Sequence, residues 1–219
     1  EAVTVQSSAT FGPVGWTRLG QDIDGEAVGD ESGVSVGLSS DGNIVAIGAI
    51  FNDATGNNAG HVRVYQRDAN KTEAVTVQSS ATFGPVGWTR LGQDIDGEAA
   101  GDNAGKSVAL SADGNIVAIG AYGNDATGSN AGHVRVYQRD ANKTEAVTVQ
   151  SSATFGPVGW TRLGQDIDGE AVGDESGVSV GLSSDGNIVA IGAIFNDATG
   201  NNAGHVRVYQ RDANKTEAV

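Results

Sequence analysis

The stretch "GVSVGLSSDGNIVAIGA" (Gly33–Ala49) contains the signals that decide the fold. Its first part, "GVSVGLS" (Gly33–Ser39), alternates apolar with small or polar residues, which is typical of a half-buried strand. Asp41-Gly42 then marks a tight hairpin turn, because glycine tolerates a positive φ. The continuously apolar "NIVAIGA" (Asn43–Ala49) predicts a strand buried on both faces. The stretch therefore predicts an antiparallel β-hairpin.

Two neighbouring segments extend this hairpin to four strands. "HVRVYQ" (His61–Gln66) alternates again and predicts a strand whose valines face inward and whose His, Arg and Tyr face outward. "WTRLGQDI" (Trp16–Ile23) predicts an outer strand that packs through its Trp and Leu. No window has a 3.6-residue apolar period long enough for a helix. The predicted fold class is all-β.

The same unit recurs with a period of 72 residues. The repeats occupy residues 1–72, 73–144 and 145–216, and residues 217–219 start a further copy. Copies one and three are identical, and copy two differs from them at nine positions, all between 28 and 57 of the repeat. A small sheet cannot bury its apolar face alone, so neighbouring repeats must cover one another. The chain therefore predicts a tandem array.

The polar segment "RDANKTEAVTVQSSATFGPVG" (Arg67–Gly87), here called the connecting segment, is expected to join one repeat to the next. Two structures fit its middle part, "AVTVQ" (Ala74–Gln78). It forms an extra strand that pairs with the sheet edge of a neighbouring repeat, the mode of β-augmentation, or an extended linker stiffened by Pro85.

The motifs "SGVSVGLSSDGNIVAIGA", "AGHVRVY" and "GWTRLGQDIDGE" resemble the blade repeats of FG-GAP, integrin-α-like β-propellers, as found in long arrays of secreted microbial and algal proteins. "SGVSV" stands where that family has its Phe-Gly pair, and "AIGA" where it has Gly-Ala-Pro. The resemblance implies four-stranded antiparallel blades. The calcium loop of the family, Asp-x-Asp-x-Asp-Gly, is replaced here by "SSDGN" or "SADGN".

Three blades do not close a ring, because propellers typically have about four to eight. The predicted architecture is therefore a series of tandem four-stranded, propeller-blade-like repeats, in an open array or as part of a larger propeller. In an open array the identical connections apply one rotation and rise per repeat, which produces a superhelix or a fibre.

Charge and composition exclude several classes of partner and site. The net charge of −14 argues against nucleic acid and against anionic membrane surfaces. No apolar run is long enough for a transmembrane helix, so no membrane insertion is expected. Cysteine is absent, and neither a G-x-S-x-G elbow nor a phosphate-binding glycine loop occurs. We expect no enzymatic activity.

The triplet "NKT" in the connecting segment is an N-glycosylation sequon. It is either a chance triplet or, in a secreted protein, a covalent glycan site in every repeat. The acceptor residues are Asn70, Asn142 and Asn214.

The acidic segment "DIDGEAVGD" (Asp22–Asp30) places four carboxylates in each repeat. They form either a Ca²⁺ site, because calcium takes six to eight oxygen ligands, or a solvated acidic turn. The residues are Asp22, Asp24, Glu26 and Asp30, then Asp94, Asp96, Glu98 and Asp102, and then Asp166, Asp168, Glu170 and Asp174. No other cofactor is expected. The one His per repeat is interpreted as a turn or sheet-surface residue, and the one Trp as packing against the adjacent blade or, alternatively, as a sugar-binding residue.

Three functions fit these observations. The first is a structural repeat protein of an extracellular filament or surface fibre, glycosylated along its length and self-associating through the connections between repeats. The second is a closed propeller that binds a glycan or protein as an adhesin or receptor module. The third is a calcium-dependent adhesive array. All three place the chain outside the cell or at its surface.

Overall fold

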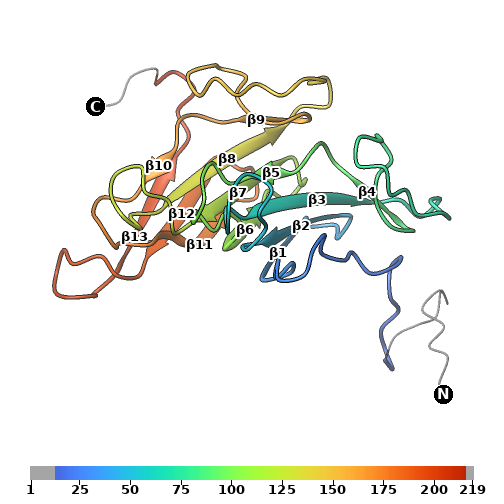
Figure 1. Ribbon diagram of the computed structural model, residues 1–219, viewed down its shortest axis with the longest axis horizontal. Helices are drawn as coiled ribbons and strands as arrows, with labels where there is room; N and C mark the ends of the chain where they lie inside the picture. Colours follow the sequence, from blue (N-terminus) through green and yellow to red (C-terminus); the bar gives the residue numbers. More distant parts are fainter. Residues whose placement is uncertain (1–12, 216–219) are drawn as a thin grey trace.

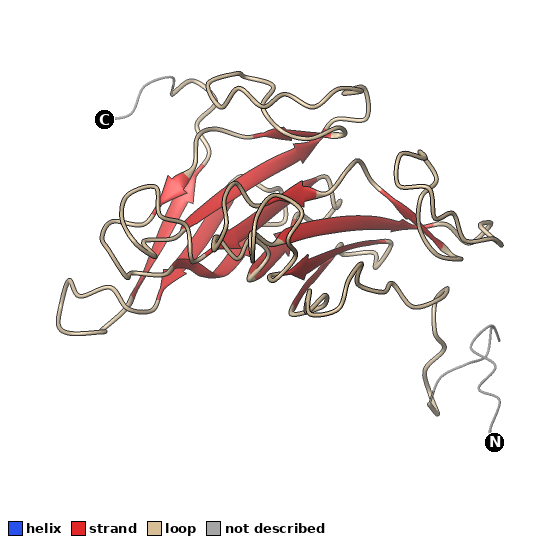
Figure 2. Cartoon of the chain, in the orientation of Figure 1, coloured by secondary structure: helices blue, strands red, loops and turns tan. Residues whose placement is uncertain are grey.

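The computed structural model describes residues 13–215, and over that range it contains strands and loops but no helix (Figure 2). The strands form three antiparallel sheets (Figure 1). The first sheet contains β1 (Ser35–Leu38), β2 (Ile44–Ala49), β3 (His61–Arg67), β4 (Trp88–Arg90) and β5 (Ile95–Asp96). The second contains β6 (Ser107–Leu110), β7 (Ile116–Ala121), β8 (His133–Arg139), β9 (Trp160–Arg162) and β10 (Ile167–Asp168). The third contains β11 (Ser176–Leu182), β12 (Ile188–Ala193) and β13 (His205–Gln210).

The predicted hairpin is confirmed in all three repeats. β1 pairs antiparallel with β2 in a register that places Val36 opposite Ile47, and β2 pairs with β3. Asp41 shapes the turn between β1 and β2, because its Oδ1 accepts hydrogen bonds from the Ser39 hydroxyl at 2.7 Å and from the Asn43 amide at 2.9 Å. The turn and its two strands therefore form from residues close together in the sequence.

The outer strand of each sheet comes from the following repeat. β4 and β5 belong to the second sequence repeat but pair with β3 of the first, with Arg90 opposite Tyr65 and Ile95 opposite Val62. β9 and β10 pair with β8 in the same way. The sequence interpretation placed four strands within each repeat. The structural unit is instead shifted along the chain, so each complete sheet combines strands from two repeats.

The connecting segment (Arg67–Gly87) is a loop within one sheet, since it leads from β3 to β4. Val75 and Gly84 exchange two backbone hydrogen bonds of 2.9 Å inside it, so its "AVTVQ" part pairs within its own loop. It neither adds a strand to a neighbouring sheet nor runs as an extended linker. The first copy of this part lies outside the described residues. The chain crosses between sheets later, at residues 97–106, where the Ala104 amide donates to the Ala59 carbonyl at 2.9 Å.

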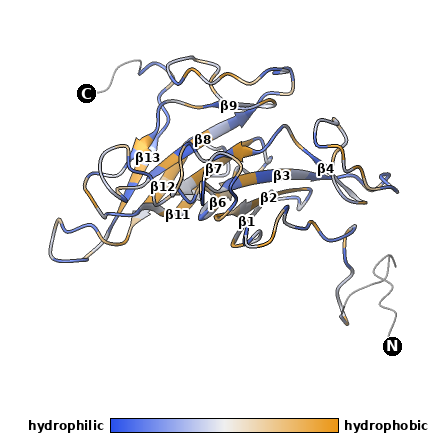
Figure 3. Ribbon diagram, in the orientation of Figure 1, coloured by the Kyte–Doolittle hydropathy of each residue, from blue (hydrophilic) through white to orange (hydrophobic). Residues whose placement is uncertain are grey.

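Successive sheets pack face to face and share one core. β1 and β2 lie against β6, and β6 and β7 lie against β11. Ile44 and Val62 of the first sheet join Val108 and Val117 of the second in one buried cluster. Figure 3 shows hydrophobic residues along β12 and β13. Over residues 13–215 the sheets close into no barrel. The chain is all-β and consists of successive blade-like antiparallel sheets, as the sequence predicts.

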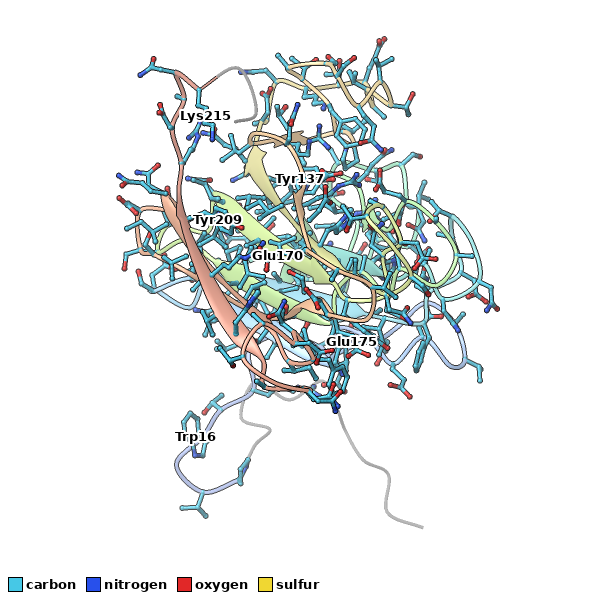
Figure 4. The ribbon with its side chains drawn as sticks, turned by 90° about the vertical axis from the view of Figure 1, so that its left-hand side faces the viewer. Trp16, Tyr137, Glu170, Glu175, Tyr209 and Lys215 are labelled. Carbon is cyan, nitrogen blue, oxygen red and sulfur yellow. The ribbon has the colours of Figure 1, made fainter. Side chains whose placement is uncertain are left out.

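The tryptophans pack against the preceding repeat. The indole Nε1 of Trp88 donates to the Leu19 carbonyl at 3.0 Å, and that of Trp160 donates to the Leu91 carbonyl at 2.9 Å. Trp88 is 8% exposed and Trp160 is fully buried. Trp16 has no preceding repeat among the described residues. It is 77% exposed on a segment that projects away from the sheets (Figure 4).

Candidate functional site at the repeat boundary

The polar residues of the third strand are buried, although the sequence predicts that they face outward. His61 is 3% exposed, Arg63 6% and Tyr65 2%, and the equivalent residues of β8 are buried to the same extent. The period-two pattern identifies their face of the strand correctly. The acidic segment and the connecting segment that follow in the chain then cover this face.

Arg63 forms contacts with carboxylates of two repeats. Its guanidinium donates two hydrogen bonds of 3.0 Å to the carboxylate of Asp94, which belongs to the following repeat. It also forms an ion pair with Glu26 of its own repeat. Arg90 donates to Asp94 at 2.5 Å. Bidentate, charge-assisted hydrogen bonds of this kind are the strong ones in proteins. Burial alone would lower the pKa of Arg63, but the hydrogen bonds and charge of Asp94 raise it overall.

The connecting segment folds over this ion-pair network. Arg90 donates from Nη2 to the Gln78 carbonyl at 2.7 Å, and its guanidinium lies 4.5 Å from the centroid of the Phe83 ring. Lys71 donates to the Trp88 carbonyl at 2.8 Å. The second boundary has the same network, in which Arg135 donates to Asp166 at 2.8 and 2.7 Å.

The four carboxylates of each acidic segment are placed in different settings. In the second copy, Asp94 lies between the two arginines, and Glu98 forms an ion pair with Arg135. Asp102 accepts hydrogen bonds from the Glu98 and Ala99 amides at 3.0 and 3.1 Å, so it shapes the turn between sheets. The first copy, Asp22–Asp30, has no preceding sheet among the described residues. Calcium binding by the whole set stays a prediction.

Asp96 is the fourth carboxylate, and it lies opposite His61 in the β3–β5 pair. Burial, together with the charges of Asp94 and Glu26, raises the pKa of Asp96 to about 6. Burial also lowers the pKa of His61. At this boundary, burial therefore disfavours the charged form of both the imidazole and the carboxylate.

The sequence interpretation missed the role of the His and Arg residues. Two signals could have identified it. One Arg recurs on the outward face of each third strand, and the acidic segment that pairs with this strand carries carboxylates at alternate positions. Neither signal shows that the strand and the acidic segment that pairs with it belong to different repeats.

An open groove of about 640 Å³ lies beside the network at each boundary. The first is lined by Glu26, Arg63 and Gln78 among others, and the second includes Glu98, Arg135 and Gln150. The groove gives small ions and solvent access to the edge of the network.

The sequon asparagines lie at the surface. Asn70, Asn142 and Asn214 are all exposed, in turns that directly follow the third strands. The hydroxyl residues Thr72 and Thr144 are exposed as well, whereas Thr216 lies outside the described residues. Access for a glycosyl transferase is therefore open at the first two sequons.

No protein-family model and no curated protein matches the sequence of this chain. Residues 13–215 include no helix with the length and apolar character that crossing a membrane requires.

Proposed function

We propose that this chain is a structural repeat protein of an extracellular filament or surface fibre, in which each repeat donates its outer strand to the sheet of the repeat before it. The observation that carries the proposal is the pairing of β4 and β5 with β3, and of β9 and β10 with β8. The two interfaces have the same register, and in both the third-strand arginine donates two hydrogen bonds to the aspartate of the following repeat. An interface that repeats without change propagates a linear array.

The first and last parts of the described range are complementary. Val206 and Val208 of β13 are 68% and 65% exposed, and no outer strand pairs with β13 among the described residues. At the other end, Trp16 is 77% exposed. The donated segment at that end has the sequence that pairs with β3 and β8. A further repeat or a second copy of the chain can therefore continue the array, which is the head-to-tail contact that generates filaments.

The acidic surface and the sequons fit a filament outside the cell. A net charge of −14 keeps neighbouring filaments apart. The exposed sequon asparagines are spaced by one repeat, so glycans attached there would decorate the filament at regular intervals.

Electron microscopy of the untruncated native protein tests the proposal. We expect long fibres of uniform width with a periodicity set by the repeat. Discs with a central hole would instead establish the alternative, a closed propeller that acts as an adhesin or receptor module.

A variant of the chain of residues 1–219 sharpens this test. Trp16→Ala removes the indole that would enter the sheet of another copy, but it touches no core within its own chain. We expect Trp16→Ala to shorten or abolish concentration-dependent polymers in light scattering while the thermal midpoint of the dilute chain stays unchanged. Val172→Ala, at another exposed apolar residue, is the control. Equal polymerisation of both variants would contradict strand donation between chains.

A further inference from the structure

We propose that each repeat boundary binds one divalent transition-metal ion of the zinc class, with the buried histidine of the third strand as the central ligand. The first site is formed by Glu26 and His61 of one repeat and by Asp94 and Asp96 of the next. The second is formed by Glu98, His133, Asp166 and Asp168. A candidate ligand atom from Glu26, His61 and Asp94 lies within 4.8 Å of the other two, and Glu98, His133 and Asp166 repeat this arrangement.

The imidazole is the observation that points to a ligand. His61 is 3% exposed, and its Nδ1 has no hydrogen-bond partner among residues 13–215. Nδ1 lies 3.8 Å from Oε2 of Glu26 and 3.9 Å from Oδ1 of Asp96, and this Asp96 oxygen is also buried and unpartnered within that range. Distances of 3.8–3.9 Å are too long for hydrogen bonds. Leaving buried polar atoms unpaired costs stability.

A metal ion would satisfy these atoms at once. Zinc binds imidazole nitrogen at about 2.0–2.1 Å and carboxylate oxygen at about 2.0–2.2 Å, so tetrahedral ligand atoms lie roughly 3.3–3.5 Å apart. The observed separations from His61 Nδ1 are within about half an ångström of that geometry. Small rotations of the Glu26 and Asp96 side chains would therefore bring these two carboxylates into position beside the imidazole.

The second boundary contains the same pair of unpartnered atoms. His133 is 3% exposed, and its Nδ1 also lacks a hydrogen-bond partner among the described residues. It lies 3.9 Å from the buried, unpartnered Oδ1 of Asp168. The same orphaned pair of atoms thus occurs in both complete boundaries.

The charge of the site favours a cation. Three carboxylates (Glu26, Asp94 and Asp96) face two guanidinium groups (Arg63 and Arg90), so acidic groups outnumber basic ones around the imidazole. Imidazole nitrogen suits zinc and related transition ions, whereas calcium prefers oxygen ligands alone. This site therefore differs from a calcium site made by the acidic segment.

The third repeat supplies a matched control. His205 Nδ1 lies 3.9 Å from Glu170, but no following acidic segment faces it among residues 13–215, and its side chain is 24% exposed. The chain of residues 1–219 should thus bind two ions, and each ion should hold two neighbouring repeats together.

Calorimetric titration of the chelator-treated chain with Zn²⁺, at a concentration at which light scattering shows the chain to be monomeric, tests the proposal. We expect two ions per chain, one after His61→Gln, none after the double variant His61→Gln/His133→Gln, and two after His205→Gln. Zn²⁺ should raise the thermal midpoint of the chain and of His205→Gln, but not that of the double variant. Circular dichroism checks that each variant folds, and Asp96→Asn replaces His61→Gln if the latter does not.

Several results would overturn the proposal. They are the absence of Zn²⁺ binding, two bound ions in the double variant, or the same loss from His205→Gln as from His61→Gln. Binding of Ca²⁺ without Zn²⁺ would also overturn it and would favour a calcium site of carboxylates alone.

Discussion

β8 and β13 have the same sequence through "HVRVYQ" but different surroundings, and the comparison shows what a repeat needs from its neighbours. Val134 and Val136 of β8 are 0% and 8% exposed, whereas Val206 and Val208 of β13 are 68% and 65% exposed. The strand itself forms in both places, paired with β7 or β12. Local pairing thus sets the strand, and the following repeat sets its burial.

The polar faces of β8 and β13 differ in burial in the same way as their valine faces. At β8, Arg135 is buried and held by Asp166 and Glu98, but at β13 the side chain of Arg207 is 26% exposed, and within residues 13–215 it forms an ion pair with Glu170 only. The charged network is therefore a property of the boundary and not of the single repeat. Substitutions at equivalent positions of the complete and incomplete units measure what the boundary contributes.

The largest difference is expected between Trp160→Ala and Trp16→Ala. Trp160 is fully buried and donates to the Leu91 carbonyl, so its loss should lower the free energy of unfolding by about 3–5 kcal/mol. Trp16 is 77% exposed, so its loss should change the free energy of unfolding by less than about 0.5 kcal/mol. Urea unfolding of dilute protein measures both. Similar losses for the two variants would show that Trp16 packs in a way that this structure does not contain.

Arg135→Met and Arg207→Met test the ion-pair network. Removing Arg135 takes the bidentate partner from Asp166 and the ion-pair partner from Glu98, and we expect a loss of about 3 kcal/mol. Removing Arg207 breaks a pair with the half-exposed Glu170 and should cost less than about 1 kcal/mol. The difference should appear as a lower urea midpoint for Arg135→Met only. A stability equal to that of the unsubstituted chain would mean that the network does not hold the repeats together.

Gly92→Ala and Gly164→Ala separate packing from backbone strain. Gly92 has a φ of +70° and Gly164 a φ of +72°, so both variants carry the left-handed penalty of about 1–2 kcal/mol. A Cβ on Gly92 would also lie 2.6 Å from the Val158 carbonyl oxygen, whereas one on Gly164 meets nothing within 4 Å. We expect Gly92→Ala to lose a further 1–3 kcal/mol or so in chemical unfolding. Equal losses of unfolding free energy in the two variants would mean that backbone strain accounts for the whole effect.

The sequence predicts the part of the fold that depends on near neighbours. The hairpin of Gly33–Ala49 follows from alternation, a turn signal and a buried apolar run, because the paired residues are close in the chain. The pairing of Trp88–Asp96 with β3 could not be predicted in the same way. In a sequence of period 72, a shift by one repeat leaves every pattern unchanged. The pattern thus identifies an outer strand but not the repeat whose sheet it joins.

The buried ion-pair network could not be predicted from the sequence for a related reason. Alternation places His61 and Arg63 on one face of their strand, yet it says nothing of what covers that face. The cover comes from the connecting segment and from the acidic segment of the next repeat. The exposed sequons were easier to place, because they lie in polar turns that no later segment covers.

The smallest expected difference concerns the β1–β2 turn and its equivalent in the third repeat. In Asp41 the amide of Asn43 and the hydroxyl of Ser39 lower the carboxyl pKa to about 2, and in Asp185 the hydroxyl of Ser183 and the amide of Asn187 lower it to about 2. A carboxyl whose folded pKa lies below its unfolded value of 3.8 stabilises the fold above that value. This contribution is lost as the pH falls from about 4 towards 2.

Asp41→Asn and Asp185→Asn should each reduce the fall of the thermal midpoint between pH 5 and pH 2, and by the same small amount. The reason is that these bonds lie within each turn and involve no neighbouring repeat. Circular dichroism melts across this pH range measure the effect. A clearly larger effect of Asp41→Asn than of Asp185→Asn would mean that the turn also depends on the neighbouring repeat. The division between local and boundary contributions, drawn from β8 and β13, would then not extend to the hairpin.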